Sequence, residues 1–267
     1  MSTEAERLTT RRGARAAPGR LFVHQLRSEQ LVFWRSREAA FFIFLFPLLL
    51  FLLLGSVYSG RIYGVPAAQA LLAGLIGYGC ANTAFAGLAI QLVLRRENGI
   101  LKRLRSTPLT PATYVAAVLT STLLVFVLQT IALFLVGRVL YGTPFPSRPG
   151  SLAATVVIGA AVFAALGTAL AAVIRSGEGS SAVVNFILLP MAFLSGAFGP
   201  TLHYPPFLRA IGDVLPLTYF IKIVNAVYLH GRPFWTQPEA LAVLCAWGVA
   251  GLVFAVLRFR WEPRSAS

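Results

Sequence analysis

The most regular feature of this sequence is a series of long apolar stretches separated by short polar or basic segments. A helix that crosses a bilayer needs about 20 mostly apolar residues. Six stretches come close to that length or exceed it, and they predict spans at 39–58, 68–94, 112–141, 151–174, 181–198 and 240–257. No A-x-A cleavage site follows the first stretch, so we expect it to be retained as a span. The pattern predicts an all-α polytopic membrane protein with six transmembrane helices.

A seventh apolar stretch, at 214–229, is shorter and is interrupted by Pro216, Lys222 and Asn225. We predict that residues 201–231 instead form an outer re-entrant hairpin between spans five and six, which dips into the outer leaflet without crossing it. The hairpin could serve as a gate or release platform for an amphipathic cargo, or its aromatic residues could simply anchor it at the interface. The residues that we expect to shape it are Pro205, Pro216, Tyr219 and Lys222.

Basic residues are distributed unevenly between the two sides of the predicted spans. Of the 23 Lys and Arg residues, 17 fall before span one, between spans two and three, between spans four and five, or after span six. Cytoplasmic loops carry an excess of Lys and Arg, so both termini are predicted to lie in the cytoplasm. The net charge of +14 follows this topology. We therefore expect no nucleic-acid partner, but an inner face that attracts anionic membrane lipid.

The chain divides into four parts. Residues 1–20 form a basic tail whose composition predicts disorder, 39–258 form the six-span domain, and 259–267 form a cytoplasmic tail. The segment 21–38 has apolar residues at helical spacing, which predicts a cytoplasmic helix lying in the membrane interface. An ordinary juxtamembrane linker is the alternative. The apolar residues assigned to this helix are Phe22, Leu26, Phe33 and Trp34.

The loop between spans two and three, residues 95–108, carries more pattern than a simple reversal of direction requires. Apolar residues at 100, 101 and 104 alternate with bases and would form one stripe on a short helix. Gly99 permits a tight turn before that helix, and Pro108 and Pro111 prevent it from continuing. The loop is predicted to be a brief amphipathic helix held between two long spans. A solvated basic loop is the alternative.

Sequence motifs for ATP hydrolysis, metal binding and proteolysis are missing from this chain. Neither Lys102 nor Lys222 follows a G-x-x-x-x-G pattern, so no P-loop is present and ATP hydrolysis would need another polypeptide. The two cysteines lack metal-ligand spacing. A serine protease built on Ser195 would need a nearby base, but no predicted span contains a histidine. We expect no catalytic residue, metal or cofactor in this chain.

Several polar residues fall inside the predicted spans. They could line a translocation path, although hydrogen bonding between helices is the simpler role for any one of them. No acidic residue lies deep in a span, which counts against a proton-coupled carrier. The candidate path residues are Asn82, Gln91, Gln129, Asn185 and Ser195.

Three segments carry further motifs. The first is Glu97-x-Gly99-x-Leu101-x-Arg103-Leu104-x-x-x-Pro108. The second is Pro190-x-x-Phe193-Leu194-Ser195-Gly196-x-Phe198-x-Pro200 with Leu215-Pro216-Leu217-Thr218-Tyr219, and the third is the run ending at Arg37 with Phe46-Pro47. The first segment resembles the cytoplasmic loop of type-2 ABC exporter permeases, and the three together resemble most closely the permeases of the daunorubicin-resistance type. One departure is that the family's frequent Arg after the Leu-Pro-Leu-Thr-Tyr motif is missing, and the nearest base is Lys222.

The resemblance implies the permease subunit of an ATP-driven exporter in the bacterial cell membrane. Its partners would be a second permease copy, identical or a close paralogue, and two copies of an ABC ATPase subunit that binds ATP and Mg. The cargo would be a hydrophobic or amphipathic compound such as a drug-like natural product or antibiotic. A permease for lipid-linked polysaccharide or lipid is the alternative, and an ion-gradient-driven secondary carrier is the alternative from another class. The implied coupling helix, braced by the helix at 21–37, comprises Glu97, Gly99, Ile100, Leu101, Arg103, Leu104 and Pro108.

Overall fold

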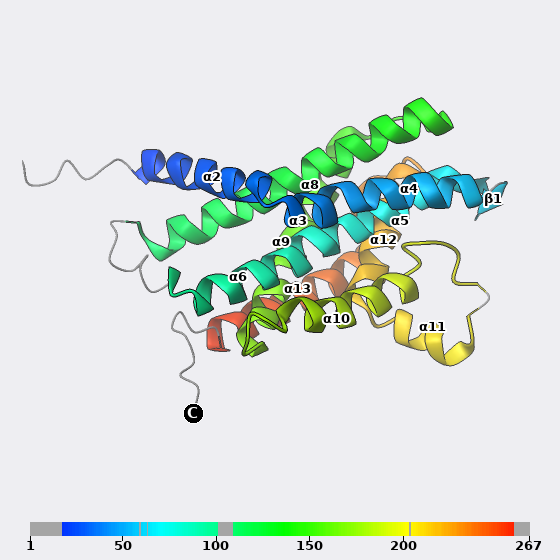
Figure 1. Ribbon diagram of the computed structural model, residues 1–267. Helices are drawn as coiled ribbons and strands as arrows, with labels where there is room; N and C mark the ends of the chain where they lie inside the picture. The colour runs from blue at the N-terminus through cyan, green and yellow to red at the C-terminus, as the bar shows by residue number, and fades with distance from the viewer. Residues whose placement is uncertain (1–17, 59, 63, 101–108, 203, 259–267) are drawn as a thin grey trace, which may run out of the picture.

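The computed structural model describes residues 18–58, 60–62, 64–100, 109–202 and 204–258. Within these residues the chain forms a bundle of long helices that run along one another (Figure 1). Five helices are long and apolar enough to cross a membrane. The prediction of an all-α polytopic membrane protein is therefore confirmed.

The first two spans are each interrupted by a π-helical segment. Helix α2 (Pro18–Arg35) leads into α3 (Arg37–Ala39), the π segment η1 (Ala40–Leu45) and α4 (Phe46–Val57). After a two-stranded antiparallel hairpin of β1 (Arg61–Ile62) and β2 (Val65–Pro66), the chain continues as α5 (Ala67–Cys80), η2 (Ala81–Gly87) and α6 (Leu88–Glu97). The last three elements form one helix of 31 residues.

The next spans begin and end at residues suited to helix termini. Helix α8 (Pro111–Tyr141) starts after Thr110, whose side chain accepts a hydrogen bond from the backbone N–H of Thr113 at 3.2 Å. It ends at Gly142, which has the left-handed backbone conformation common at helix C-termini. Helices α9 (Pro149–Val173) and α13 (Pro238–Arg258) provide two further spans.

The predicted fifth span is shorter than its apolar stretch. Helix α10 (Ser180–Leu194) has 15 residues and ends before the predicted boundary at residue 198. Ser195 and Gly196 break the helix, and Gly196 adopts a φ of 75°. Two helices follow, α11 (Pro206–Gly212) and α12 (Pro216–Tyr228), bent by 80° at their junction, and then the short η3 (Phe234–Thr236). The predicted re-entrant path of this hairpin through a membrane stays a prediction.

The 31-residue helix of α5, η2 and α6 occupies the centre of the core, where helices approach closely. A Cβ atom on Gly167 of α9 would lie 2.5 Å from the carbonyl oxygen of Phe85 in η2. A Cβ atom on Gly159 would lie 2.2 Å from the ring of Phe220 in α12. Small residues on α9 therefore permit helix contacts that any larger side chain would prevent.

The bundle has two distinct ends. The start of α2 and the ends of α6 and α13 lie at one end, called here the α6 end, and the β1–β2 hairpin and α11 lie at the other, the α11 end (Figure 1). The first and last described residues thus lie at the same end. The number of membrane crossings, predicted to be six, and the side of each terminus stay predictions.

Candidate functional site

The last turn of α6 carries three consecutive charged residues, Arg95, Arg96 and Glu97, each of which contacts a different part of the bundle. Successive residues on an α-helix point about 100° apart. The three side chains consequently reach three neighbours of α6 from a single turn.

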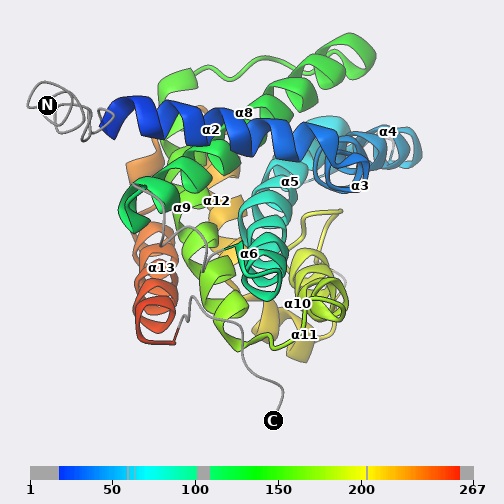
Figure 2. The same cartoon turned by 60° about the vertical axis from the view of Figure 1, so that its left-hand side comes forward.

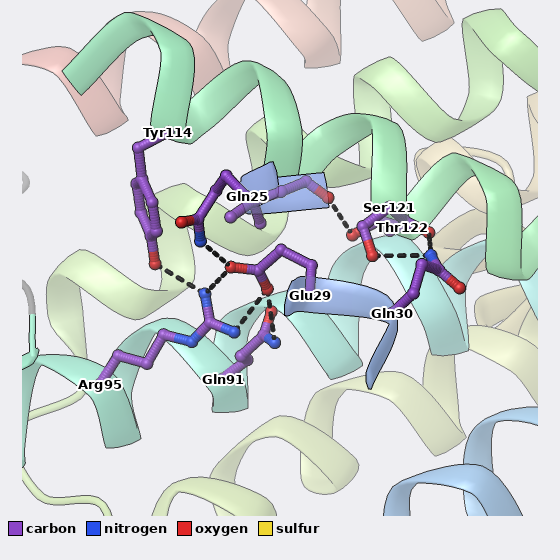
Figure 3. A network of polar contacts seen from close by, with 9 residues as sticks. Gln25, Glu29, Gln30, Gln91, Arg95, Tyr114, Ser121 and Thr122 are labelled. Atoms are coloured by element: carbon purple, nitrogen blue, oxygen red, sulfur yellow. Dashed lines mark hydrogen bonds and ion pairs between the residues drawn. The ribbon is translucent and has the colours of Figure 1, made fainter. Parts of the chain in front are cut away.

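Arg95 forms a bidentate ion pair with Glu29 of α2 (Figure 3). Its Nη1 donates to Oε1 at 2.8 Å and its Nη2 to Oε2 at 2.5 Å. Nη1 also donates to the hydroxyl of Tyr114 on α8 at 2.7 Å. Gln25 donates to Glu29 Oε1 at 2.7 Å, so the carboxylate, which is only 3% exposed, is well satisfied. Paired arginine and carboxylate groups with this geometry make strong, directional bonds.

Helix α2 is also bonded directly to α8. The side-chain amide of Gln30 donates to the backbone carbonyl of Ser121 at 3.0 Å and to its hydroxyl at 2.8 Å. Figure 2 shows α2 crossing over α8 and passing above α6. The ion pair and these hydrogen bonds together tie α2 to the end of α6 and to the first half of α8.

The face of α2 that packs on the bundle is partly polar. Phe22, Leu26 and Phe33 of the predicted apolar stripe are half-buried, but Trp34 is exposed, as are Val23, Leu31 and Val32. Glu29 is the most buried residue of the helix. The apolar side chains that remain exposed suit a helix at a membrane interface, which stays a prediction.

Arg96 attaches α6 to the C-terminal end of α9. Its guanidinium donates to the carbonyl oxygens of Ala171, at 2.9 Å, and of Ile174. The last carbonyls of a helix lack partners within the helix and carry partial negative charge. Arg96, which is only 3% exposed, supplies these carbonyls with both hydrogen-bond donors and a positive charge.

Glu97 attaches α6 to the loop between α9 and α10. Its Oε2 accepts a hydrogen bond from the backbone N–H of Gly177 at 2.6 Å. A Cβ atom on Gly177 would lie 2.0 Å from that oxygen, so only glycine leaves room for this contact. Glu97 was predicted to belong to a coupling helix, and here its carboxylate reaches the neighbouring loop that leads into α10.

The chain turns tightly after α6. Gly99 has a φ of 68°, and its N–H donates to the carbonyl of Arg96 at 3.1 Å. Ile100 is helical again and 43% exposed. The predicted tight turn at Gly99 is thus present. The remaining coupling-helix residues lie outside the described part of the chain: Leu101, Arg103, Leu104 and Pro108.

The five predicted path residues do not gather in one place. Asn82 donates to the carbonyl of Phe42 at 2.8 Å, Gln129 is fully buried and accepts from Thr83 at 3.1 Å, and Gln91 lies beside Glu29. Asn185 is exposed and bonds to the carbonyl of Ser181 within its own helix, and the hydroxyl of Ser195 accepts from Thr218 at 3.0 Å. Four of the five contact another element, which is the structural role weighed for them above.

The four predicted hairpin residues lie at the α11 end. Pro205 precedes the first turn of α11 and Pro216 opens α12, positions that suit proline because no N–H donor is needed there. Tyr219 donates to the carbonyl of Asp213 at 2.7 Å, and the ammonium of Lys222 lies 4.8 Å from the Tyr219 ring. The hydrogen bond from Tyr219 spans the bend between the two helices, and the Lys222 contact lies within α12.

Glu29 and Tyr114, and the individual roles of Arg95 and Arg96, were not predicted from the sequence. A signal was available for Glu29, because it lies four residues after Gln25 and so shares its helical face. Its partner is 66 positions away in the sequence. A metal site is not indicated, since no group of three His, Cys, Asp or Glu side chains in the described residues could hold an ion.

Comparisons with known proteins agree with this architecture. A family profile described as ABC-2 type transporter matches residues 20–229. The inner membrane transport permease YhhJ of Escherichia coli (strain K12) is 27% identical over 170 residues, which make up 63% of this chain and 46% of YhhJ. YvfS of Bacillus subtilis (strain 168), a transport permease by name, is 28% identical over 151 residues, or 55% of this chain and 60% of YvfS.

The chain spans about half the length of these relatives. The family profile, in contrast, covers most of the sequence, including α2, the charged turn of α6 and the helices of the α11 end. The chain therefore belongs to the ABC-2 type transporter family.

Proposed function

We propose that this chain is the permease subunit of an ATP-driven exporter, and that the last turn of α6 with Gly99 and Ile100 is where movement of a partner ATPase enters the bundle. The observation that carries the proposal is the distribution of contacts from Arg95, Arg96 and Glu97. Three consecutive residues join α2 and α8, the end of α9, and the loop before α10.

The position of α6 supports a lever at this point. It is the last part of a 31-residue helix. Of the 18 consecutive residues of that helix that are most apolar, 94% are buried inside the bundle. A displacement of residues 98–100 would act on the most central helix of the bundle. The charged turn would carry the same displacement sideways to its neighbours, because buried and bidentate contacts hold their geometry.

Membership of the ABC-2 type family supports the partners in this proposal. The ATPase would supply the P-loop, ATP and Mg that this sequence does not provide, with two ATPase copies acting on two permease copies. Leu101, Arg103, Leu104 and Pro108 would complete the docking surface. Exposed apolar side chains on α10, including Phe186, Ile187 and Leu189, offer a surface for lipid or a second permease.

The cargo in this proposal is a hydrophobic or amphipathic compound, exported from the cell. The likeness of the motifs to daunorubicin-resistance permeases supports a drug-like molecule over a lipid-linked polysaccharide. An ion-driven carrier would need an acid free to exchange protons. Glu29 is the only buried acid among the described residues, and its pairing with Arg95 favours a bracing role.

The experiment compares two glycines with nearly the same geometry. Gly99 and Gly142 have φ values of 68° and 63°, and at either position a Cβ atom would meet none of the described residues within 4 Å. Alanine should therefore cause similar local strain at both. With the ATPase co-expressed and the complex in nanodiscs, Gly99→Ala should reduce cargo-stimulated ATP turnover and Gly142→Ala should not. Equal turnover in both variants would remove the lever hypothesis.

A second measurement addresses the cargo. Cells that express the chain with its ATPase should accumulate less of a fluorescent drug-like amphiphile than cells that carry Gly99→Ala. If drug-like compounds accumulate equally and a lipid-linked glycan instead reaches the cell surface only with the wild-type chain, the alternative cargo holds.

A further inference from the structure

A polar pocket of about 340 Å³ lies at the α11 end of the bundle, opposite the charged turn of α6. The end of α10, α11 and α12 enclose it. A volume of this size lies at the lower limit of typical ligand pockets. The side chains in its wall that can contact a charged ligand are Ser195, Arg209, Asp213, Lys222, Asn225 and His230.

Positive charge predominates in this pocket. Among the described residues, its wall contains two basic side chains, Arg209 and Lys222, and one carboxylate, Asp213. The ammonium of Lys222 lies 3.8 Å from Asp213 Oδ1, well beyond the 2.7–2.9 Å of a charge-assisted hydrogen bond. The two side chains are 50% and 69% exposed. The lysine is thus open to a second anion.

Arg209 is oriented but not saturated. Its Nε donates to the carbonyl of Tyr204 at 3.0 Å. Among the described residues, its two terminal nitrogens have no hydrogen-bond partner, nor does the half-buried side-chain amide of Asn225. A guanidinium held by one edge presents its remaining donors in the fork that matches phosphate oxygens.

We infer that this pocket binds the phosphate headgroup of an amphiphile. Arg209 and Lys222 would contact the phosphate oxygens, and Asn225 would donate a further hydrogen bond. Exposed apolar side chains lie next to the pocket wall: Phe207 and Ile211, four residues apart on α11, share one face, and Val214 follows. The apolar chain of the ligand would lie along this face while its headgroup occupies the pocket.

This site does not depend on the lever at the α6 end. The ligand is either the proposed amphipathic cargo, which would then carry an anionic headgroup, or a bound lipid. Only the assignment to cargo rests on the proposed function. Binding can be measured without an ATPase, so its failure and a failure of energy coupling give different results.

The test uses the full chain in a phosphate-free maltoside detergent with fluorescent lysophosphatidic acid as the probe. Wild type should bind it, and Arg209→Gln and Lys222→Gln should each weaken binding about tenfold, the usual effect of losing a charge-assisted bond. Arg138→Gln is the matched control, because Arg138 is an exposed arginine in the last turn of α8 and does not line the pocket. It should bind as wild type does.

Two further results decide the inference. Among the described residues, Asp213 is the only carboxylate in the pocket wall, so Asp213→Asn should tighten binding, whereas damage to the fold would loosen it. Equal binding by Arg209→Gln, Lys222→Gln and Arg138→Gln, or weaker binding by Asp213→Asn, would overturn the site. Inorganic phosphate should compete only at far higher concentration than unlabelled lysophosphatidic acid. Competition at equal concentration would overturn the assignment to an amphiphile.

Discussion

The carboxylate of Glu29 on α2 accepts two hydrogen bonds from the guanidinium of Arg95 on α6, at 2.8 and 2.5 Å, and both groups are largely withdrawn from solvent. This pair joins the helix that precedes the first span to the end of the second span. Whatever moves the end of α6 must therefore also move α2 or break the pair.

Removing one member of this pair should destabilise the protein. Glu29→Gln keeps the shape of the side chain but leaves the charge of Arg95 buried without its partner, which costs about 3 kcal/mol in comparable pairs. We expect a lower Tm in nanodiscs and weaker coupling of ATP turnover to cargo. Glu38→Gln is the control, since Glu38 is exposed in the adjacent helix, and it should melt as wild type does.

A double substitution tests whether the two residues act on each other. The destabilisation in Glu29→Gln with Arg95→Met should be smaller than the sum of the two single effects, by about 1–3 kcal/mol. Strictly additive effects would show that each side chain contributes through other contacts.

The contact between Glu97 and the loop before α10 predicts a large effect at Gly177. In Gly177→Ala the new Cβ would lie 2.0 Å from Glu97 Oε2 and 2.9 Å from Leu94, so the hydrogen bond at 2.6 Å must break. ATP turnover should become uncoupled from transport. Gly179 lies two residues on, with nothing within 4 Å of its Cβ position, so Gly179→Ala should leave coupling unchanged. Similar transport rates in the two variants would argue against this contact as a link.

Asn82 and Asn185, both predicted path residues, should differ in their effect on stability. Asn82→Ala removes the hydrogen bond to the Phe42 carbonyl and should lower the free energy of unfolding by about 1 kcal/mol. Asn185 is exposed and bonds only within α10, so Asn185→Ala should have little effect on stability. Guanidinium unfolding in detergent measures both. A transport defect in Asn185→Ala without loss of stability would instead place that residue on the cargo path.

Because α9 packs closely against the central helix, alanine substitutions at two of its glycines should change the free energy of unfolding differently. Gly167→Ala would place a Cβ 2.5 Å from the Phe85 carbonyl, and separating the helices should cost about 1–3 kcal/mol. Gly150 has open space around its Cβ position, so Gly150→Ala should be neutral or stabilising by up to about 1 kcal/mol. Thermal unfolding of both variants tests the packing. Equal Tm values would show that α9 can shift away without cost.

Some of these features were accessible from sequence because they depend on local chemistry. The spans follow from runs of apolar residues, and the turn at Gly99 follows from a glycine in the loop between two spans. Each signal lies within a few residues of the structure that it produces. The apolar run to residue 198 nevertheless overstated the fifth span, because composition does not register where a helix breaks.

Other features depend on partners distant in the sequence. Glu29 was missed because its burial makes sense only beside Arg95, and nothing in a single sequence pairs the two. Arg96 looked like one more base of a cytoplasmic loop, although it is buried against the end of α9. The π segments had no sequence signal either, since the amide of Asn82 meets the Phe42 carbonyl only once the two spans pack.

The π segment η2 has a consequence for the charged turn that follows it. A π segment holds one residue more than an α-helix of the same rise, and one residue rotates everything after it by about 100° around the helix axis. The number of residues in Ala81–Gly87, about two to four turns earlier in the helix, therefore sets the direction in which Arg95, Arg96 and Glu97 point. Deleting one residue there would turn Arg95 away from Glu29 without altering either side chain. The angular setting of the lever is thus encoded in the length of η2.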